Sequence, residues 1–157
     1  MHRFAIIAVI LLSPLLASAH VGHSDDPIKA RRAYFTLIGT NMAVLGAIAK
    51  SEESDLPTAA DTYARNLGAL MSYDATLHFL EGTSNEDHPG KTRALPAIWE
   101  GEGRVSDTFL KRWNVMSEAV SALKEEAGKG RAALGAALAK VGGTCKGCHD
   151  DFRAKDF

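Results

Sequence analysis

Apolar side chains recur in this chain at alternating intervals of four and three residues, and this spacing constrains the fold more than any other sequence feature. The clearest series is Leu134, Leu138, Val141, Cys145, Cys148 and Phe152. Intervals of four and three place side chains on one face of an α-helix. Four separate segments carry such a face, and no segment alternates apolar and polar residues for long. The sequence therefore predicts an all-α protein, an antiparallel four-helix bundle.

The first predicted helix starts at Asp26 and Pro27, because aspartate is a preferred N-cap and proline a preferred first helical residue. Its apolar series is Ile28, Phe35, Ile38, Met42, Leu45 and Ala49. Leu37, Val44 and Ile48 lie beside this series, so the helix has more apolar surface than one core face requires. We therefore expect these three residues to form a two-fold interface in a homodimer.

The other three helices are separated by breaks in the pattern. The second opens at Pro57 and ends near Phe79, and its inward residues are Tyr63, Leu67, Leu70 and Leu77. Turn-forming residues over 82–93 predict a long loop. The third helix begins near Ser106, and its inward residues are Phe109, Trp113, Met116, Val120, Leu123 and Ala127. The fourth follows Gly128.

The first nineteen residues have the features of an export signal. A short basic start precedes an apolar run over residues 4–16, and Ala17-Ser18-Ala19 has the small-x-small pattern that signal peptidase recognises. The apolar run is too short for a permanent membrane helix, which needs roughly 20 residues. We expect cleavage after Ala19, which leaves one soluble domain over residues 20–157.

The charge balance and the cysteine count exclude several classes. Lysine and arginine number 18 against 19 aspartates and glutamates, and removal of Arg3 with the signal leaves 17 against 19, a net charge of −2. A weakly acidic chain without a basic block suits neither nucleic acid nor a charged membrane surface, so we expect neither partner. Two cysteines cannot form a multi-disulfide scaffold.

The two cysteines and the histidine after them form the pattern C-x-x-C-H over residues 145–149. This pattern is the attachment sequence for c-type haem. Thiols three residues apart project from the same face of a helix, where they can add to the two vinyl groups of one porphyrin, and the adjacent histidine reaches the iron. The motif predicts one haem c bound covalently by Cys145 and Cys148, near the C-terminus of the bundle, with His149 as an axial iron ligand.

Other interpretations of the motif remain open. A redox-active C-x-x-C pair normally opens a helix after a strand, whereas this pair lies inside a predicted helix. Structural zinc requires four ligands, and the chain offers the two cysteines, His149 and one distant histidine, such as His78 or His88. A plain disulfide and a chance occurrence are the remaining alternatives. Export and the placement of both cysteines in one motif favour haem.

Three segments of the chain together resemble cytochrome c′, the class II c-type cytochromes. They are residues 140–153 around the motif, residues 92–99, and residues 30–35 in the first helix, and the resemblance spans essentially all of residues 20–157. The C-terminal segment is the most specific, because most other c-type cytochromes of this size carry C-x-x-C-H near the N-terminus. The resemblance implies a periplasmic, usually dimeric haem protein that is linked to nitric oxide binding and electron transfer.

The resemblance also implies the state of the iron. In low-spin relatives a methionine on the first helix ligates the iron, and an arginine lies four residues before that position. Arg31 and Phe35 occupy the two positions here. A phenyl ring cannot ligate iron, so we expect high-spin, five-coordinate iron that is open to a diatomic gas.

Four further contacts with the haem are expected. Arg31 suits a bidentate pair with a haem propionate. Arg153 lies one turn after His149, where similar proteins use an arginine to shelter the proximal ligand. The resemblance places Arg32 and Thr92 beside the haem edge.

Two other functions remain as alternatives. One is a dedicated low-spin electron carrier with an unidentified sixth ligand; Met42 is a poor candidate, because seven residues at roughly 1.5 Å each put it about 10 Å along the helix from Phe35. The other is a haem enzyme that reduces nitric oxide or peroxide. Peroxide cleavage usually requires a distal acid–base group, and Phe35 offers none. We therefore expect a gas-binding and electron-transfer protein rather than an enzyme, with a redox partner that the sequence does not identify.

Overall fold

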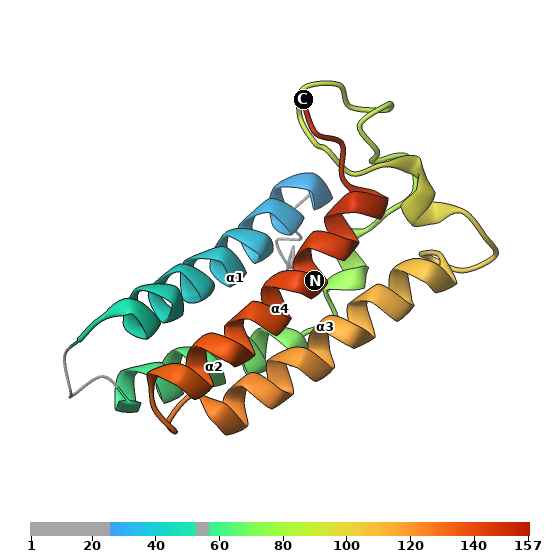
Figure 1. The fold of residues 1–157 in the computed structure, drawn as a ribbon. Coiled ribbons are helices and arrows are strands. Elements are labelled where there is room, and N and C mark those ends of the chain that lie inside the picture. The colour runs from blue at the N-terminus through green and yellow to red at the C-terminus, as the bar shows by residue number, and fades with distance from the viewer. Residues whose placement is uncertain (1–25, 53–56) are drawn as a thin grey trace, which may run out of the picture.

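The computed structural model describes residues 26–52 and 57–157, so the predicted export signal and its cleavage site lie outside the described residues. Successive helices run antiparallel (Figure 1): α1 (Pro27–Lys50), α2 (Pro57–Ser72), α3 (Asp107–Glu126) and α4 (Arg131–Phe152). The α1 helix packs on α2 and α4, and α3 packs on the same two helices. The predicted antiparallel four-helix bundle is confirmed.

Local sequence signals set where the helices begin. Asp26 caps α1 as predicted, because its carboxylate accepts a hydrogen bond from the backbone N–H of Lys29 at 2.9 Å. Ser106 caps α3 in the same way, and its hydroxyl accepts from the N–H of Phe109 at 3.2 Å. The α4 helix begins after Gly130, slightly later than predicted. Gly130 has a φ of 101°, which favours glycine.

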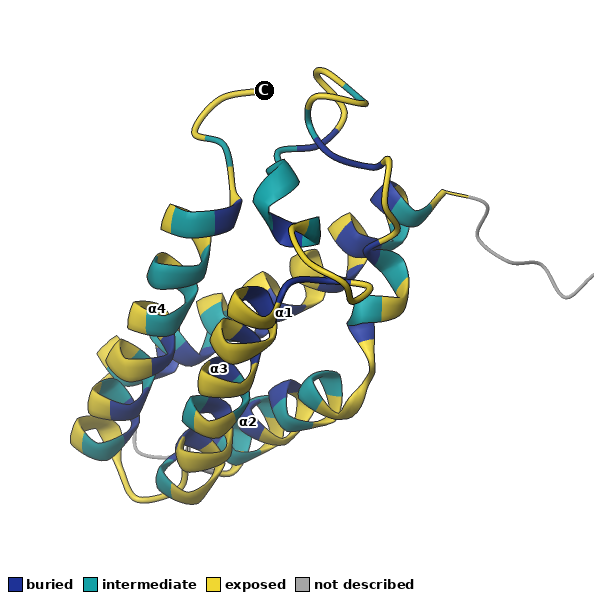
Figure 2. Ribbon diagram, turned by 90° about the vertical axis from the view of Figure 1, so that its right-hand side faces the viewer, coloured by how far each residue is buried: buried dark blue, intermediate teal, exposed yellow. Residues whose placement is uncertain are grey.

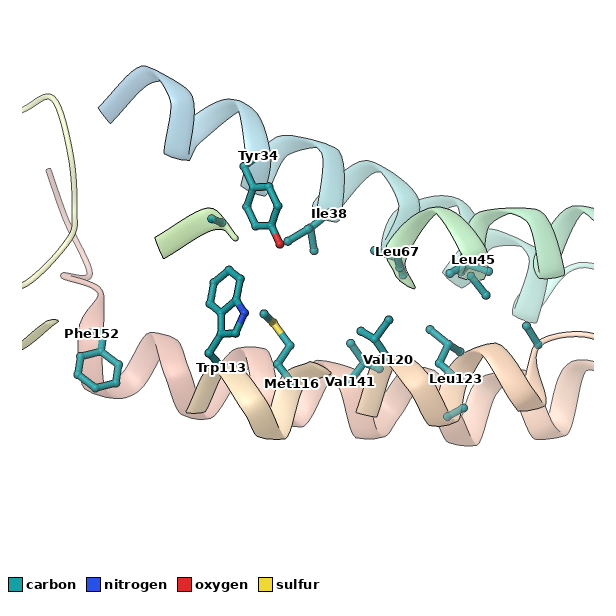
Figure 3. Close-up of a cluster of buried hydrophobic side chains, with 14 of the residues drawn as sticks. Tyr34, Ile38, Leu45, Leu67, Trp113, Met116, Val120, Leu123, Val141 and Phe152 are labelled. Carbon is teal, nitrogen blue, oxygen red and sulfur yellow. The ribbon is translucent and has the colours of Figure 1, made fainter. Parts of the chain in front are cut away.

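The core changes in character along the bundle. Its fully buried large side chains are aliphatic: Leu45, Leu67, Leu123, Leu134, Val120 and Val141. Buried residues lie on the inner sides of the helices and exposed residues on the outer sides (Figure 2). Towards the end that carries the long loop, the aromatic side chains Tyr34, Trp113 and Phe152 replace the leucines and valines (Figure 3).

The buried face of α1 differs from the predicted apolar series. Phe35 is 38% exposed, and Met42 is only half-buried, whereas Tyr34 is buried. Two polar residues, Arg31 and Asn41, lie on the buried face as well. A search for apolar residues passes over buried polar ones. The buried face of α1 is therefore rotated by about one residue position relative to the predicted face.

The outward face of α1 is partly apolar. Ile48 is buried in the core, so the expectation that it belongs to an outer interface is wrong, whereas Leu37 is 53% exposed and Val44 is half-buried. Among the described residues, α1 is the one helix long and apolar enough, by length and composition alone, to cross a membrane. It is nevertheless a bundle helix, with Arg31 and Asn41 buried against its neighbours.

The α2 helix ends at Ser72, well before the predicted end near Phe79. The N–H of Tyr73 bonds to the carbonyl of Leu70 at 3.2 Å, and Asp74 then caps the short 3₁₀ helix η1 (Ala75–His78). This change of direction leaves Leu77 48% exposed, contrary to its predicted inward position.

The loop predicted over 82–93 is confirmed, and it leads into a second 3₁₀ helix, η2 (Pro96–Trp99). The chain beside it is paired with the end of α4 by an isolated antiparallel bridge between Ala94 and Arg153. The N–H of Leu95 bonds to the carbonyl of Phe152 at 3.0 Å. Residues 92–95 therefore lie along the last residues of the chain.

Candidate functional site

A cavity of about 710 Å³ lies at the aromatic end of the bundle, between α1, α3, α4 and the segment 91–94. All eight predicted site residues line it: Arg31, Arg32, Phe35, Thr92, Cys145, Cys148, His149 and Arg153. The volume falls within the range of about 300–1,000 Å³ that is typical of small-molecule and cofactor sites. The fold thus brings together residues from three distant parts of the sequence.

The α4 helix contributes both thiols. Cys145 and Cys148 are half-buried, and their sulfur atoms are not joined in a disulfide. Burial raises the pKa of the Cys145 thiol, and burial together with the neighbouring Cys145 raises the pKa of Cys148 to about 11. Redox-active pairs have lowered thiol pKa values, so this environment does not favour thiol–disulfide chemistry.

A zinc site finds no support in the part of the chain that the structure describes. Over residues 26–52 and 57–157, no three or more His, Cys, Asp or Glu side chains come together in a group able to hold a metal ion. Structural zinc is held by four such ligands.

His149 lies in the last turn of α4 and lines the cavity at its exposed edge. Partial burial and the charge of Arg93 lower the pKa of the imidazole. The neutral ring that this favours is the form that ligates metals. Arg153 ends the helix, because its backbone is extended and its N–H bonds to the carbonyl of His149 at 3.1 Å. The Arg153 side chain is exposed at the same edge.

Arg31 is the most deeply buried cation of the site, at 4% exposed. Its guanidinium donates to the hydroxyl and carbonyl oxygens of Thr83 at 2.6 and 2.8 Å, to the carbonyl of His78 at 3.2 Å and to the Thr92 hydroxyl at 3.4 Å. It also lies 5.0 Å from the centre of the Phe79 ring. Burial lowers the pKa of Arg31 to about 10.

All four acceptors of Arg31 are neutral oxygens. No ion pair within the described ranges includes Arg31. A buried charge without a counter-charge is costly. The charge of Asp26 raises the pKa of Arg31 but offsets only part of the effect of burial, so the positive charge is incompletely compensated at this point.

The α1 side of the cavity presents a phenyl ring and a thioether. Phe35 packs edge-on against Trp113 and Phe79, with ring centres 6.2 and 6.4 Å apart. Met42 of α1 and Met116 of α3 line the same cavity. Trp113 and Met116 were predicted to point inward from the third helix; both are buried, and both also line the cavity.

Among the lining residues that were not predicted from the sequence, Arg93 and Phe157 come from the segment 91–94 and from the C-terminal end of the chain. The Arg93 guanidinium lies 5.0 Å from the centre of the Phe157 ring and donates to the carbonyl of Lys155 at 3.2 Å. Both reach the cavity because the last residues fold back along the segment 92–95, and no local pattern signals that pairing. Trp99 does not line the cavity; its indole N–H donates to the carbonyl of Phe79 at 3.0 Å.

The cavity is strongly cationic although the chain as a whole carries a small negative charge. Its lining includes Arg31, Arg32, Lys91, Arg93 and Arg153, whereas none of the described aspartates and glutamates lines it. Most of the other lining side chains are apolar. Such a site suits a ligand with a large apolar body and negatively charged substituents.

Comparison with known proteins gives one family. The cytochrome c′ family profile matches residues 26–153. A cytochrome c′ of Cereibacter sphaeroides is 39% identical over 150 residues, which cover 96% of this chain and 97% of that protein. Cytochrome c-554 of the same organism is 33% identical over 129 residues, covering 82% of this chain and 81% of its own.

The solved structures agree with this assignment. A cytochrome c′ described as from Rhodobacter Spheriodes has a TM-score of 0.75 and 42% identity, and the match covers 82% of this chain and 95% of that one. Cytochrome c′ is itself a standard example of the up-down-up-down four-helix bundle seen here. The chain therefore belongs to the cytochrome c′ family and is a c-type haem protein.

Proposed function

We propose that one haem c is attached covalently to Cys145 and Cys148, with His149 as its axial iron ligand. The observation that carries this proposal is that the two thiols and the imidazole follow one another on α4 and line one cavity of about 710 Å³. When bound, haem supplies an iron centre that exchanges single electrons and binds small gases. The apolar lining suits the porphyrin, and the cationic side chains suit its propionates.

Arg31 is proposed to pair with a propionate. Its buried guanidinium donates only to neutral oxygens, and the charge of Asp26 offsets only part of the effect of burial, so a propionate carboxylate would add counter-charge in a bidentate pair. Thr92 supports the orientation, because its hydroxyl accepts from Arg31 and from the N–H of Ala94 at 3.2 Å. Arg32 is exposed and lines this end of the cavity, and we propose that it lies at the haem edge.

On the α4 side, partial burial and the charge of Arg93 favour neutral His149, and the exposed Arg153 is proposed to shelter the imidazole from solvent. On the α1 side, Phe35 offers no atom that ligates iron. The proposal is therefore high-spin, five-coordinate iron that binds a diatomic gas, nitric oxide in particular, and that also takes part in electron transfer. Neither role requires substrate turnover, and we do not assign an enzymatic activity as the main function.

A dedicated low-spin electron carrier is the second candidate, and one observation favours it. Met42 and Met116 both line the cavity, so thioether sulfur is available there. Met42 lies seven residues after Phe35, which corresponds to about 10 Å along α1. We retain Phe35 as the residue of α1 nearest the iron. In the alternative, the low-spin electron carrier, Met42 would be the sixth iron ligand.

The mature protein is proposed to be a periplasmic domain of residues 20–157, released by cleavage after Ala19. We further propose a homodimer through the outward face of α1, now restricted to Leu37 and Val44 because Ile48 is buried. One cytochrome c′ of 25% identity and TM-score 0.72 is described as having an unusual ligand-controlled dimer dissociation, which supports the proposal of a dimer.

An absorption spectrum of the purified protein tests the proposed function. Protein made together with the haem-attachment machinery should show a high-spin absorption spectrum in both the ferric and the ferrous form. The spectrum of the ferrous form should change when carbon monoxide is added. A low-spin spectrum with a methionine-to-iron band would favour the carrier instead. Protein that lacks haem would refute both.

A further inference from the structure

Among the described aromatic residues that line the cavity, one has a ring that is readily oxidised. The rings of phenylalanine, tyrosine and tryptophan that line it belong to Phe35, Phe79, Phe109, Phe152, Phe157 and Trp113. Indoles and phenols lose an electron far more easily than phenyl rings do. An electron that passes between the cavity and the rest of the protein is therefore expected to pass first through the Trp113 ring.

A row of rings leads from Trp113 to the surface. Trp113 stacks on Tyr34 with ring centres 5.9 Å apart and an interplanar angle of 22°. Tyr34 lies 5.9 Å from Tyr73. Trp113 and Tyr34 are buried, whereas Tyr73 is 45% exposed. Figure 3 shows Tyr34 pointing from α1 towards Trp113. Electron tunnelling weakens steeply with distance, so rings in contact form a favoured route through the protein.

The two phenols differ in what accepts their protons. The Tyr34 hydroxyl donates to the carbonyl of Leu70 at 2.8 Å, and a peptide carbonyl is a very weak base. The Tyr73 hydroxyl lies 2.5 Å from Nε2 of His78, and the two rings stack at 5.6 Å. Imidazole is a base near neutral pH. A phenol that loses an electron becomes strongly acidic, so oxidation is favoured at Tyr73, where a base takes the proton.

We propose that Trp113, Tyr34 and Tyr73 form a one-electron relay between the cavity and a surface oxidation site at the Tyr73–His78 pair. The proposal rests on haem being bound in the cavity. The oxidant is a hydroperoxide, and the substrates are small organic one-electron donors that reach Tyr73. Tyr34 acts as the bridging ring, and Tyr73 holds the oxidising equivalent.

The reaction balances over two cycles. Reduction of the hydroperoxide to an alcohol and water consumes two electrons and two protons. Each electron passes from Tyr73 through the row of rings, while the phenolic proton moves to His78 and from there to solvent. A donor then returns one hydrogen atom to Tyr73. Because Phe35 brings no acid–base group to the cavity, turnover will be slow, so the test follows the radical rather than the rate.

The experiment uses ferric holoprotein, stoichiometric hydrogen peroxide, rapid freezing and electron paramagnetic resonance, with spin trapping and peptide mass mapping in parallel. Tyr73→Phe removes one hydroxyl and keeps the ring. Tyr63→Phe is the matched control, because Tyr63 is the one tyrosine of the chain besides Tyr34 and Tyr73 and lies on α2 outside the row of rings. His78→Gln keeps a hydrogen-bond acceptor and removes the base. The haem spectrum of each variant is recorded first.

The relay predicts a tyrosyl radical and a trap adduct at Tyr73 in the wild-type protein and in Tyr63→Phe, and loss of both in Tyr73→Phe and His78→Gln. A radical that survives Tyr73→Phe, an adduct at Tyr63, or the absence of any tyrosyl radical would overturn it. A normal haem spectrum with any of these results leaves the proposed function intact. A protein without haem would refute the proposed function and the relay together.

Discussion

Replacement of Phe35 should change the iron environment in a direction set by the new side chain. Phe35→Met brings a thioether to the part of α1 where a phenyl ring now lines the cavity. We expect some or all of the haem to become low-spin and six-coordinate, because thioether sulfur is a strong axial ligand. Phe35→Ala opens the same face, and we expect a higher affinity for carbon monoxide. Absorption spectra and carbon monoxide titrations measure both effects.

The stability cost of Phe35→Ala follows from the packing of the ring. Truncation of a well-buried phenylalanine costs about 3–5 kcal/mol. Phe35 lines the cavity that haem is proposed to fill, so we expect a cost within this range in the holoprotein. Part of this is the loss of the edge-on contact with Tyr34, whose ring centre lies 5.4 Å away. Phe35→Met keeps most of the volume and should cost less than about 1.5 kcal/mol. Urea unfolding of the holoproteins measures both values.

Met42→Ala is the matched control, because Met42 lines the same cavity from the same helix. We expect its spectrum to match that of the wild-type protein. If Met42→Ala instead abolished a low-spin spectrum, while both changes at Phe35 left the spectrum untouched, the register of α1 relative to the iron would be wrong and the electron-carrier function would replace the gas-binding one.

The remaining predictions concern the axial ligand, acid stability and association. His149→Ala should keep haem attached through both cysteines but change its spin state, and an unchanged spectrum would mean that His149 is not the ligand. The hydroxyl and N–H of Ser84 donate to Asp87 at 2.6 and 3.0 Å and lower its pKa. The contribution of the ionised Asp87 carboxylate to stability is therefore complete above the unfolded pKa of about 3.9, and it is lost as pH falls through the lower pKa of the folded state. Asp87→Asn should reduce the dependence of urea unfolding on acid pH. Equal acid dependence in the wild-type protein and the variant would contradict this. Leu37→Glu should convert the dimer to a monomer in sedimentation experiments, and a monomeric wild-type protein at tens of micromolar would refute the interface.

Much of the fold could be predicted because its determinants are local in the sequence. The four-and-three spacing identified four helices, and Asp26 with Pro27 marked the start of α1 at the right residue. The register of α1 could not be read in the same way. Arg31 and Asn41 are buried and polar, while the apolar Phe35 and Met42 line a cavity rather than the core. A pattern of apolar residues cannot distinguish these two environments.

The site was predictable to the extent that its chemistry lies in short motifs. Cys145, Cys148 and His149 share one stretch of α4, and the cavity is built around that stretch. Arg93 and Phe157 join the site through the bridge between Ala94 and Arg153, a long-range pairing without a periodic signal. The hydrogen bonds that hold Arg31 likewise depend on how the long loop folds.

The most direct test of the account is the mass of the intact protein, measured under denaturing conditions after export and haem attachment. We predict the mass of residues 20–157 plus one haem, and the mass of the polypeptide alone when Cys145 and Cys148 are both replaced by alanine. A wild-type protein that loses its haem on denaturation, or a double variant that keeps it, would contradict covalent attachment at these two cysteines.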